Sequence, residues 1–89
     1  MAELARFYGI VVAIFFRGEV GRHNTPHVHV TYNEFTAAIG FDGQVLAGDL
    51  PGRARNLVRQ WMRAHREELQ LAWGRAQRGS RPQKIEPLP

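Results

Sequence analysis

The chain has 89 residues, a net charge of +4 and no cysteine. This length indicates one domain, and the absence of cysteine excludes disulfides and thiolate chemistry. The longest apolar run, Ile10 to Phe16, is far shorter than the ~20 residues of a membrane helix. Residues 1–6 carry Glu3 and lack the pattern of a signal peptide. We therefore expect a cytoplasmic protein without a membrane partner.

The first half of the chain predicts four strands in an antiparallel meander, at about residues 6–16, 27–32, 35–41 and 44–47. The first of these is rich in β-branched and aromatic residues on both faces, which favours a central strand covered on both sides. Gly9 inside it indicates a bulge or a close backbone approach. Asn33-Glu34 and Asp42-Gly43 predict tight turns between later strands.

The second half predicts helix over residues 52–78, because apolar side chains recur there at helical spacing. One long helix or two shorter ones fit this pattern, with a break near residues 64–66. His65 falls within the apolar stripe, and we expect it to be partly buried and structural. The whole is an α+β domain over residues 1–79, with the helical region packed on one face of the sheet, and residues 80–89 form an extended C-terminal arm.

Three of the four histidines fall within seven residues, in the segment His23-Asn24-Thr25-Pro26-His27-Val28-His29. Strand alternation places Val28, Val30 and Tyr32 toward the core and His27, His29 and Thr31 outward. The Cβ atoms of His27 and His29 should then lie about 6–7 Å apart, and His23 is near enough to fold back toward them.

This histidine segment has three interpretations. Three histidines around one open position suit a catalytic divalent metal such as zinc. Two histidines can also act as general base and general acid in RNA cleavage, because an imidazole pKa of about 6.5 allows both protonation states at neutral pH. In the third interpretation they are ordinary surface residues of an edge strand.

Eleven of the twelve basic residues are arginines, whose planar side chains suit phosphate and carboxylate groups. At about 100° per residue, four of them lie within an arc of roughly 80° on the predicted helix. These residues, which we call the arginine ridge, are Arg55, Arg59, Arg63 and Arg66. The ridge could follow a phosphate backbone, or it could be the solvated face of an ordinary helix, balanced by Glu67 and Glu68.

Several segments together resemble a known family. They are Arg6-Phe7-Tyr8-Gly9-Ile10, the histidine segment with Tyr32 after it, Leu50-Pro51 before a Trp-bearing helix, and Lys84-Ile85-Glu86-Pro87-Leu88. Over nearly the whole chain the sequence is similar to the short bacterial proteins grouped as the domain of unknown function DUF4160. The family's usual histidine segment is His-x-Pro-Pro-His-Phe-His; here Thr25 and Val28 depart from it, and the three histidines are kept.

The family has no established activity. Its genes often lie beside a second small gene, as in toxin–antitoxin pairs, so the resemblance implies a cytoplasmic bacterial protein with a small partner protein encoded nearby. We therefore predict a component of a toxin–antitoxin-like pair that acts on or binds RNA, with His23, His27 and His29 as catalytic residues and the arginine ridge as the nucleic-acid contact.

The alternative is a non-catalytic metal-binding or protein-interaction module, in which the same three histidines are metal ligands. The sequence leaves open whether the protein is an enzyme, whether a divalent metal such as zinc is its cofactor, and whether the chain forms a homo-oligomer.

Overall fold

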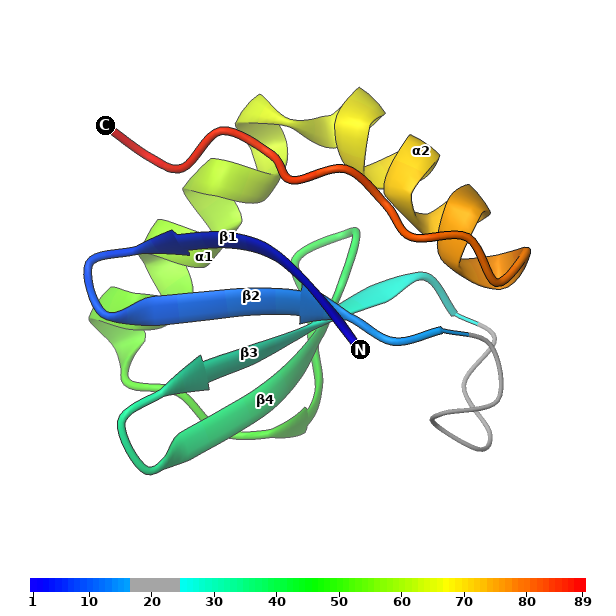
Figure 1. The fold of residues 1–89 in the computed structure, drawn as a ribbon. Coiled ribbons are helices and arrows are strands. Elements are labelled where there is room, and N and C mark those ends of the chain that lie inside the picture. The colour runs from blue at the N-terminus through cyan, green and yellow to red at the C-terminus, as the bar shows by residue number, and fades with distance from the viewer. Residues whose placement is uncertain (17–24) are drawn as a thin grey trace.

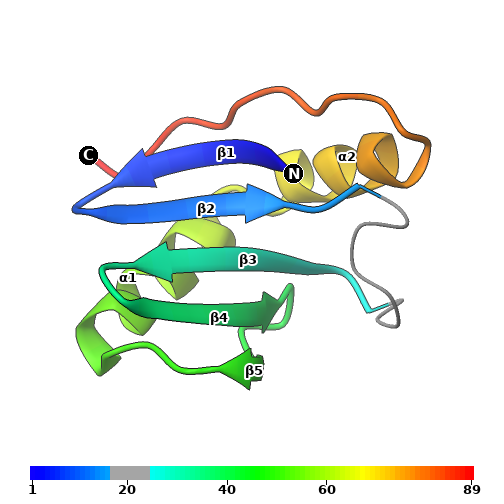
Figure 2. The ribbon, with the colours of Figure 1, turned by 60° about the horizontal axis from the view of Figure 1, so that its bottom comes forward.

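In the computed structural model, which describes residues 1–16 and 25–89, five antiparallel strands are followed by two helices. The strands pair in chain order as one open sheet. They are β1 (Ala2–Phe7), β2 (Ile10–Ile14), β3 (His27–Tyr32), β4 (Phe35–Gly40) and β5 (Val45–Gly48). The helices, α1 (Gly52–Ala64) and α2 (Arg66–Gln77), both lie on one face of the sheet, as Figures 1 and 2 show from two directions.

The N-terminal part of the sheet corrects one prediction. The strand predicted over residues 6–16 is two strands, β1 and β2, so the described residues form five strands where four were expected. The two strands are joined by a turn at Tyr8-Gly9, with φ of 50° and 79°. Positive φ at both positions is the geometry of a two-residue hairpin loop of type I′. Gly9 therefore makes a turn, and the bulge expected there is absent from that position.

The core fills the space between the sheet and the two helices. Val28 and Val30 are fully buried, which confirms that these two side chains of β3 face the core. Trp61 of α1 is the largest fully buried side chain, and its ring lies 5.7 Å from that of Phe7 in β1. The core residues of the sheet thus come from β1 as well as from the strands that the sequence predicted.

The helical region divides at His65, whose φ of −123° and ψ of 36° are not helical. Two helices therefore form, with the break inside the predicted interval. The ring of His65 packs 5.7 Å from the ring of Trp61, and its Nδ1 lies 2.7 Å from Oε1 of Glu68. His65 is half-buried, as expected for a structural residue at this junction.

Residues 80–89 contain no helix or strand and run beside β1. The backbone N–H of Ile85 donates to the carbonyl of Leu4 at 2.8 Å, and the indole N–H of Trp61 donates to the carbonyl of Glu86 at 2.8 Å. Ile85 is buried in the same core as the helices. The segment thus closes the outer edge of β1. Within the part of the chain described, neither helix is long and apolar enough to cross a membrane.

Candidate functional site

The histidine segment lies only partly within the described residues, because His23 falls outside them. His27 is 6 % exposed, which corrects the expectation that it faces outward to solvent. Its ring lies 5.6 Å from the ring of Trp73 in α2, and its Nδ1 lies 2.7 Å from the carbonyl oxygen of Thr25. Strand alternation could not foresee this, since the covering side chain comes from a helix 46 positions further along the chain.

His29 is half-buried, and its ring meets the ring of Phe15 edge to face at a centroid distance of 4.9 Å. Burial lowers the pKa of His29 below its usual value, and electrostatic repulsion by His27 lowers the pKa of His29 further. His27 is therefore close enough to act on His29, and the neutral form of the His29 imidazole is favoured. Over residues 1–16 and 25–89, no three His, Asp or Glu side chains are grouped to hold a metal ion.

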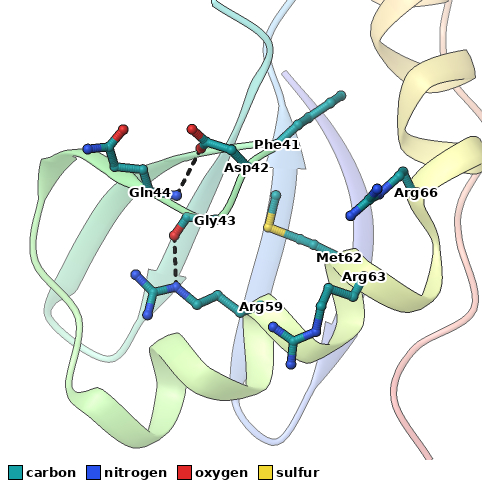
Figure 3. Close-up of a pocket in the computed structure, with 8 residues that line it drawn as sticks. All are labelled: Phe41, Asp42, Gly43, Gln44, Arg59, Met62, Arg63 and Arg66. Atoms are coloured by element: carbon teal, nitrogen blue, oxygen red, sulfur yellow. Dashed lines mark hydrogen bonds between the residues drawn. The ribbon is translucent and has the colours of Figure 1, made fainter.

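The arginine ridge contributes most of its members to one hollow. Arg59, Arg63 and Arg66 line a hollow of about 360 Å³ together with the hairpin between β4 and β5. Figure 3 shows this arrangement, with arginines from α1 and the start of α2 on one side and residues 41–44 on the other. Arg55, the fourth member of the ridge, is not among the lining residues, and its Nε is buried without a hydrogen-bond partner in the described structure.

Arg59 is fixed by the hairpin. Its Nε donates to the carbonyl of Gly43 at 2.8 Å, and this bond is drawn in Figure 3. The hairpin is in turn closed by Asp42, whose Oδ1 accepts the backbone N–H of Gln44 at 3.0 Å. A guanidinium has five N–H donors, so Arg59 keeps its terminal nitrogens for a ligand while its orientation is set.

Arg63 and Arg66 are exposed. Among the described residues neither arginine makes an ion pair, and the carboxylate of Glu68 lies against His65. Three arginines therefore face a single lining carboxylate, that of Asp42. The lining of the hollow therefore carries an excess of positive charge, while the exposed Glu67 and Glu68 are not among its lining residues.

The floor of this hollow, which we call the arginine hollow, is apolar. Met62 is buried and Phe41 is half-buried, and both line it. The ring of Phe41 lies 6.0 Å from the ring of Trp73, the same indole that covers His27. His27 is therefore linked to the hollow through two aromatic rings, although it is not one of its lining residues.

Helical spacing in the sequence predicts that the arginines share one face of a helix, but it does not predict the contact between these arginines and the β4–β5 hairpin. Asp42-Gly43 was identified as a turn, and turn residues carry no information about which helix they will approach. Only the packing of α1 across the sheet brings Gly43 to Arg59. The break at His65 also alters the arc calculated for an unbroken helix, yet Arg66 still lines the hollow.

Of the comparisons with known proteins, the one with protein families gives a match. No curated protein and no solved structure matches the chain. Residues 9–74 match the family model described as domain of unknown function (DUF4160). The matched segment runs from the turn before β2 into α2 and includes both histidines of β3 and all three arginines of the hollow. Because it covers well over half of the sequence, the chain belongs to the DUF4160 family.

Proposed function

We propose that this protein binds single-stranded RNA through the arginine hollow. The observation that carries the proposal is the convergence of Arg59, Arg63 and Arg66 on one concave surface, where Asp42 is the one acidic residue of the lining within the described part of the chain. Guanidinium groups bind phosphate oxygens in a planar, bidentate manner. An apolar floor beside them, at Phe41, suits the face of a base.

The shape of the surface favours a single strand over a duplex. A DNA major groove admits a helix or ribbon that projects from the protein. Here the arginines line a recess between α1 and the β4–β5 hairpin. A nucleic acid therefore has to fit into this recess to contact them. A flexible strand with unstacked bases can do so, and RNA recognition commonly uses such strands.

Binding of a labelled 12-nucleotide RNA, measured by fluorescence anisotropy at low salt, tests the proposal. The Arg63→Gln/Arg66→Gln variant should bind about tenfold more weakly or worse, since each charge-assisted hydrogen bond contributes about 1.5–3 kcal/mol. The matched control is Arg75→Gln/Arg78→Gln, which removes the same charge from exposed positions of α2 and its end. Equal losses in both variants, or no binding by the natural chain, would refute the proposal.

As a second candidate we propose a histidine site formed by His27 and His29 with His23. Its support is the position of His27 and His29 two residues apart on β3 and the lowered pKa of His29, which favours an unprotonated imidazole nitrogen that could bind zinc or accept a proton. Titration of tag-free protein with zinc, and an RNA cleavage assay, distinguish the metal role from the acid–base role. A His29→Ala variant that alters neither result excludes both.

We also propose that the protein acts in the cytoplasm with a small partner protein, as one member of a toxin–antitoxin-like pair. The support is the family resemblance and the positive charge of the chain. Two results would support the pair: co-purification with the product of a neighbouring gene, and growth arrest when one of the two proteins is expressed without the other. Harmless expression of both and no co-purification would count against it.

A further inference from the structure

A second hollow lies at the start of α1 and has a different chemistry. It has a volume of about 240 Å³, and its lining consists of Tyr8, Ile10, Tyr32, Arg53, Ala54 and Leu57. Ile10 and Ala54 are buried and form an apolar floor. Two phenol rings and one guanidinium stand around that floor, so the hollow combines aromatic faces with a positive charge.

Tyr8 is held in an unusual position at this hollow. It occupies the first place of the β1–β2 turn with a φ of 50°, although it is a bulky residue. Asn and Gly are the residues that fit this place readily. Its side chain is 59 % exposed, and its hydroxyl donates to the carbonyl of Pro89, which fixes the ring. Bulky residues held at positive φ occur preferentially at functional sites.

Tyr32 and Arg53 complete the hollow. The ring of Tyr32 lies over Gly9, since a Cβ placed on that glycine would be 3.6 Å from Cε1 of Tyr32. Arg53 is exposed, and in residues 1–16 and 25–89 it makes neither an ion pair nor a side-chain hydrogen bond. A ligand with a flat ring and a negatively charged group would meet both features at once.

We propose that the hollow formed by Tyr8, Tyr32 and Arg53 binds a nucleotide, with its base stacked on Tyr8 and its phosphate paired with Arg53. Stacking of this kind tolerates every base, because each has a π-face. The natural source of the nucleotide is single-stranded RNA, and to that extent the inference rests on the proposed function. Free nucleotide is the alternative source of the same chemistry.

The two hollows are separate subsites. At about 100° per residue, Arg53 and Leu57 lie on one flank of α1, and Arg59 and Arg63 lie on the other. Arg63 follows Arg53 by ten positions in the helix, which also separates them by about 15 Å along the axis. A substitution in one hollow should therefore leave the other intact.

The test uses Tyr8→Asn and Tyr8→Phe. Asn suits the left-handed turn position, so Tyr8→Asn removes the ring while keeping the hairpin, which its thermal melting temperature verifies. Tyr8→Phe keeps the ring and removes the hydroxyl that bonds Pro89. Tyr8→Asn should weaken binding of the 12-nucleotide RNA by about fivefold or more. It should leave binding of an abasic oligonucleotide of equal length unchanged, and Tyr8→Phe should bind both as the natural chain does.

Equal weakening by Tyr8→Phe and Tyr8→Asn would show that the Pro89 contact matters rather than the ring, and would overturn the inference, as would unchanged RNA binding in Tyr8→Asn. If the natural chain binds no RNA, uridine monophosphate decides the matter by ¹H–¹⁵N NMR. Shifts of the Gly9, Ile10 and Arg53 amides that inorganic phosphate does not reproduce would support a free-nucleotide site, although the proposed function has failed. No such shifts would overturn the inference.

Discussion

Gly48, at the end of β5, should be the glycine least tolerant of a side chain. Its φ is +77°, and a Cβ built there would lie 2.2 Å from the carbonyl oxygen of Thr36 and 2.9 Å from Cα of Ala37. That carbonyl oxygen accepts the backbone N–H of Asp49 at 3.0 Å. A Gly48→Ala substitution therefore has to move β5 away from β4, and it cannot be relieved by a rotamer change, because both obstructing atoms belong to the backbone.

The expected loss is the sum of two effects. Left-handed backbone costs an alanine about 1–2 kcal/mol, and breaking the hydrogen bond between Asp49 and Thr36 costs about 1 kcal/mol, with the remaining overlap in addition. Gly79→Ala is the matched control, because Gly79 also has a φ of +77° but has no atom within 4 Å of the added Cβ. Because the left-handed cost is common to both variants, the lost hydrogen bond and the overlap make up the difference, and Gly48→Ala should lower the free energy of unfolding by about 1 kcal/mol or more beyond Gly79→Ala.

Urea unfolding followed by tryptophan fluorescence, to which the buried Trp61 contributes, measures this difference. With a slope of about 1 kcal/mol per molar urea for a small domain, the midpoint of Gly48→Ala should lie about 1 M or more below that of Gly79→Ala. Because the β4–β5 hairpin forms one wall of the arginine hollow, weaker RNA binding should accompany the loss. Equal midpoints would refute the close pairing of β4 and β5 at Gly48.

Two further predictions concern the histidines and the C-terminal segment. Because the pKa of His29 is lowered in the folded state, the unfolded chain takes up this proton first; the free energy of unfolding should fall as pH drops below about 6.5, and His29→Asn should flatten that part of the profile in urea titrations. A profile unchanged by the substitution would argue against the burial of His29. Ile85→Ala removes three buried carbons, which contribute at least about 2 kcal/mol, and should speed hydrogen exchange of the amide that bonds Leu4. Unaltered exchange would show that residues 80–89 do not depend on this side chain for docking.

Local periodicity predicted much of the fold. Alternating side chains in residues 27–32 identified β3 and its buried valines, and Asp42-Gly43 identified the β4–β5 turn. Helical spacing after Pro51 identified the helical region and the interval in which it breaks. In each case the signal lies within a few neighbouring residues.

The first strand could not be recognised in the same way. Ala2–Phe7 has the sequence AELARF, and Ala, Glu, Leu and Arg favour helix over strand when considered alone. Pairing with β2 determines its conformation instead. The turn at Tyr8 was equally hidden, since a tyrosine at positive φ is not a recognisable turn signal.

The candidate site shows the same limit. Helical periodicity predicted that the arginines of the ridge lie on one face. The hollow itself forms only because tertiary packing places the β4–β5 hairpin next to these arginines. The burial of His27 under Trp73 depends on the placement of α2 across the sheet. Both are contacts between segments far apart in the chain, which no local pattern contains.

The salt dependence of RNA binding tests the arginine hollow most directly. For single-stranded nucleic acid, the logarithm of the binding constant falls with the logarithm of salt concentration at a slope of about −0.7 for each phosphate contacted. Arg63→Gln/Arg66→Gln should therefore reduce the magnitude of the slope by about 1.4, whereas Arg75→Gln/Arg78→Gln should leave it unchanged. The same slope in the natural chain and in Arg63→Gln/Arg66→Gln would contradict the binding of phosphates in the arginine hollow.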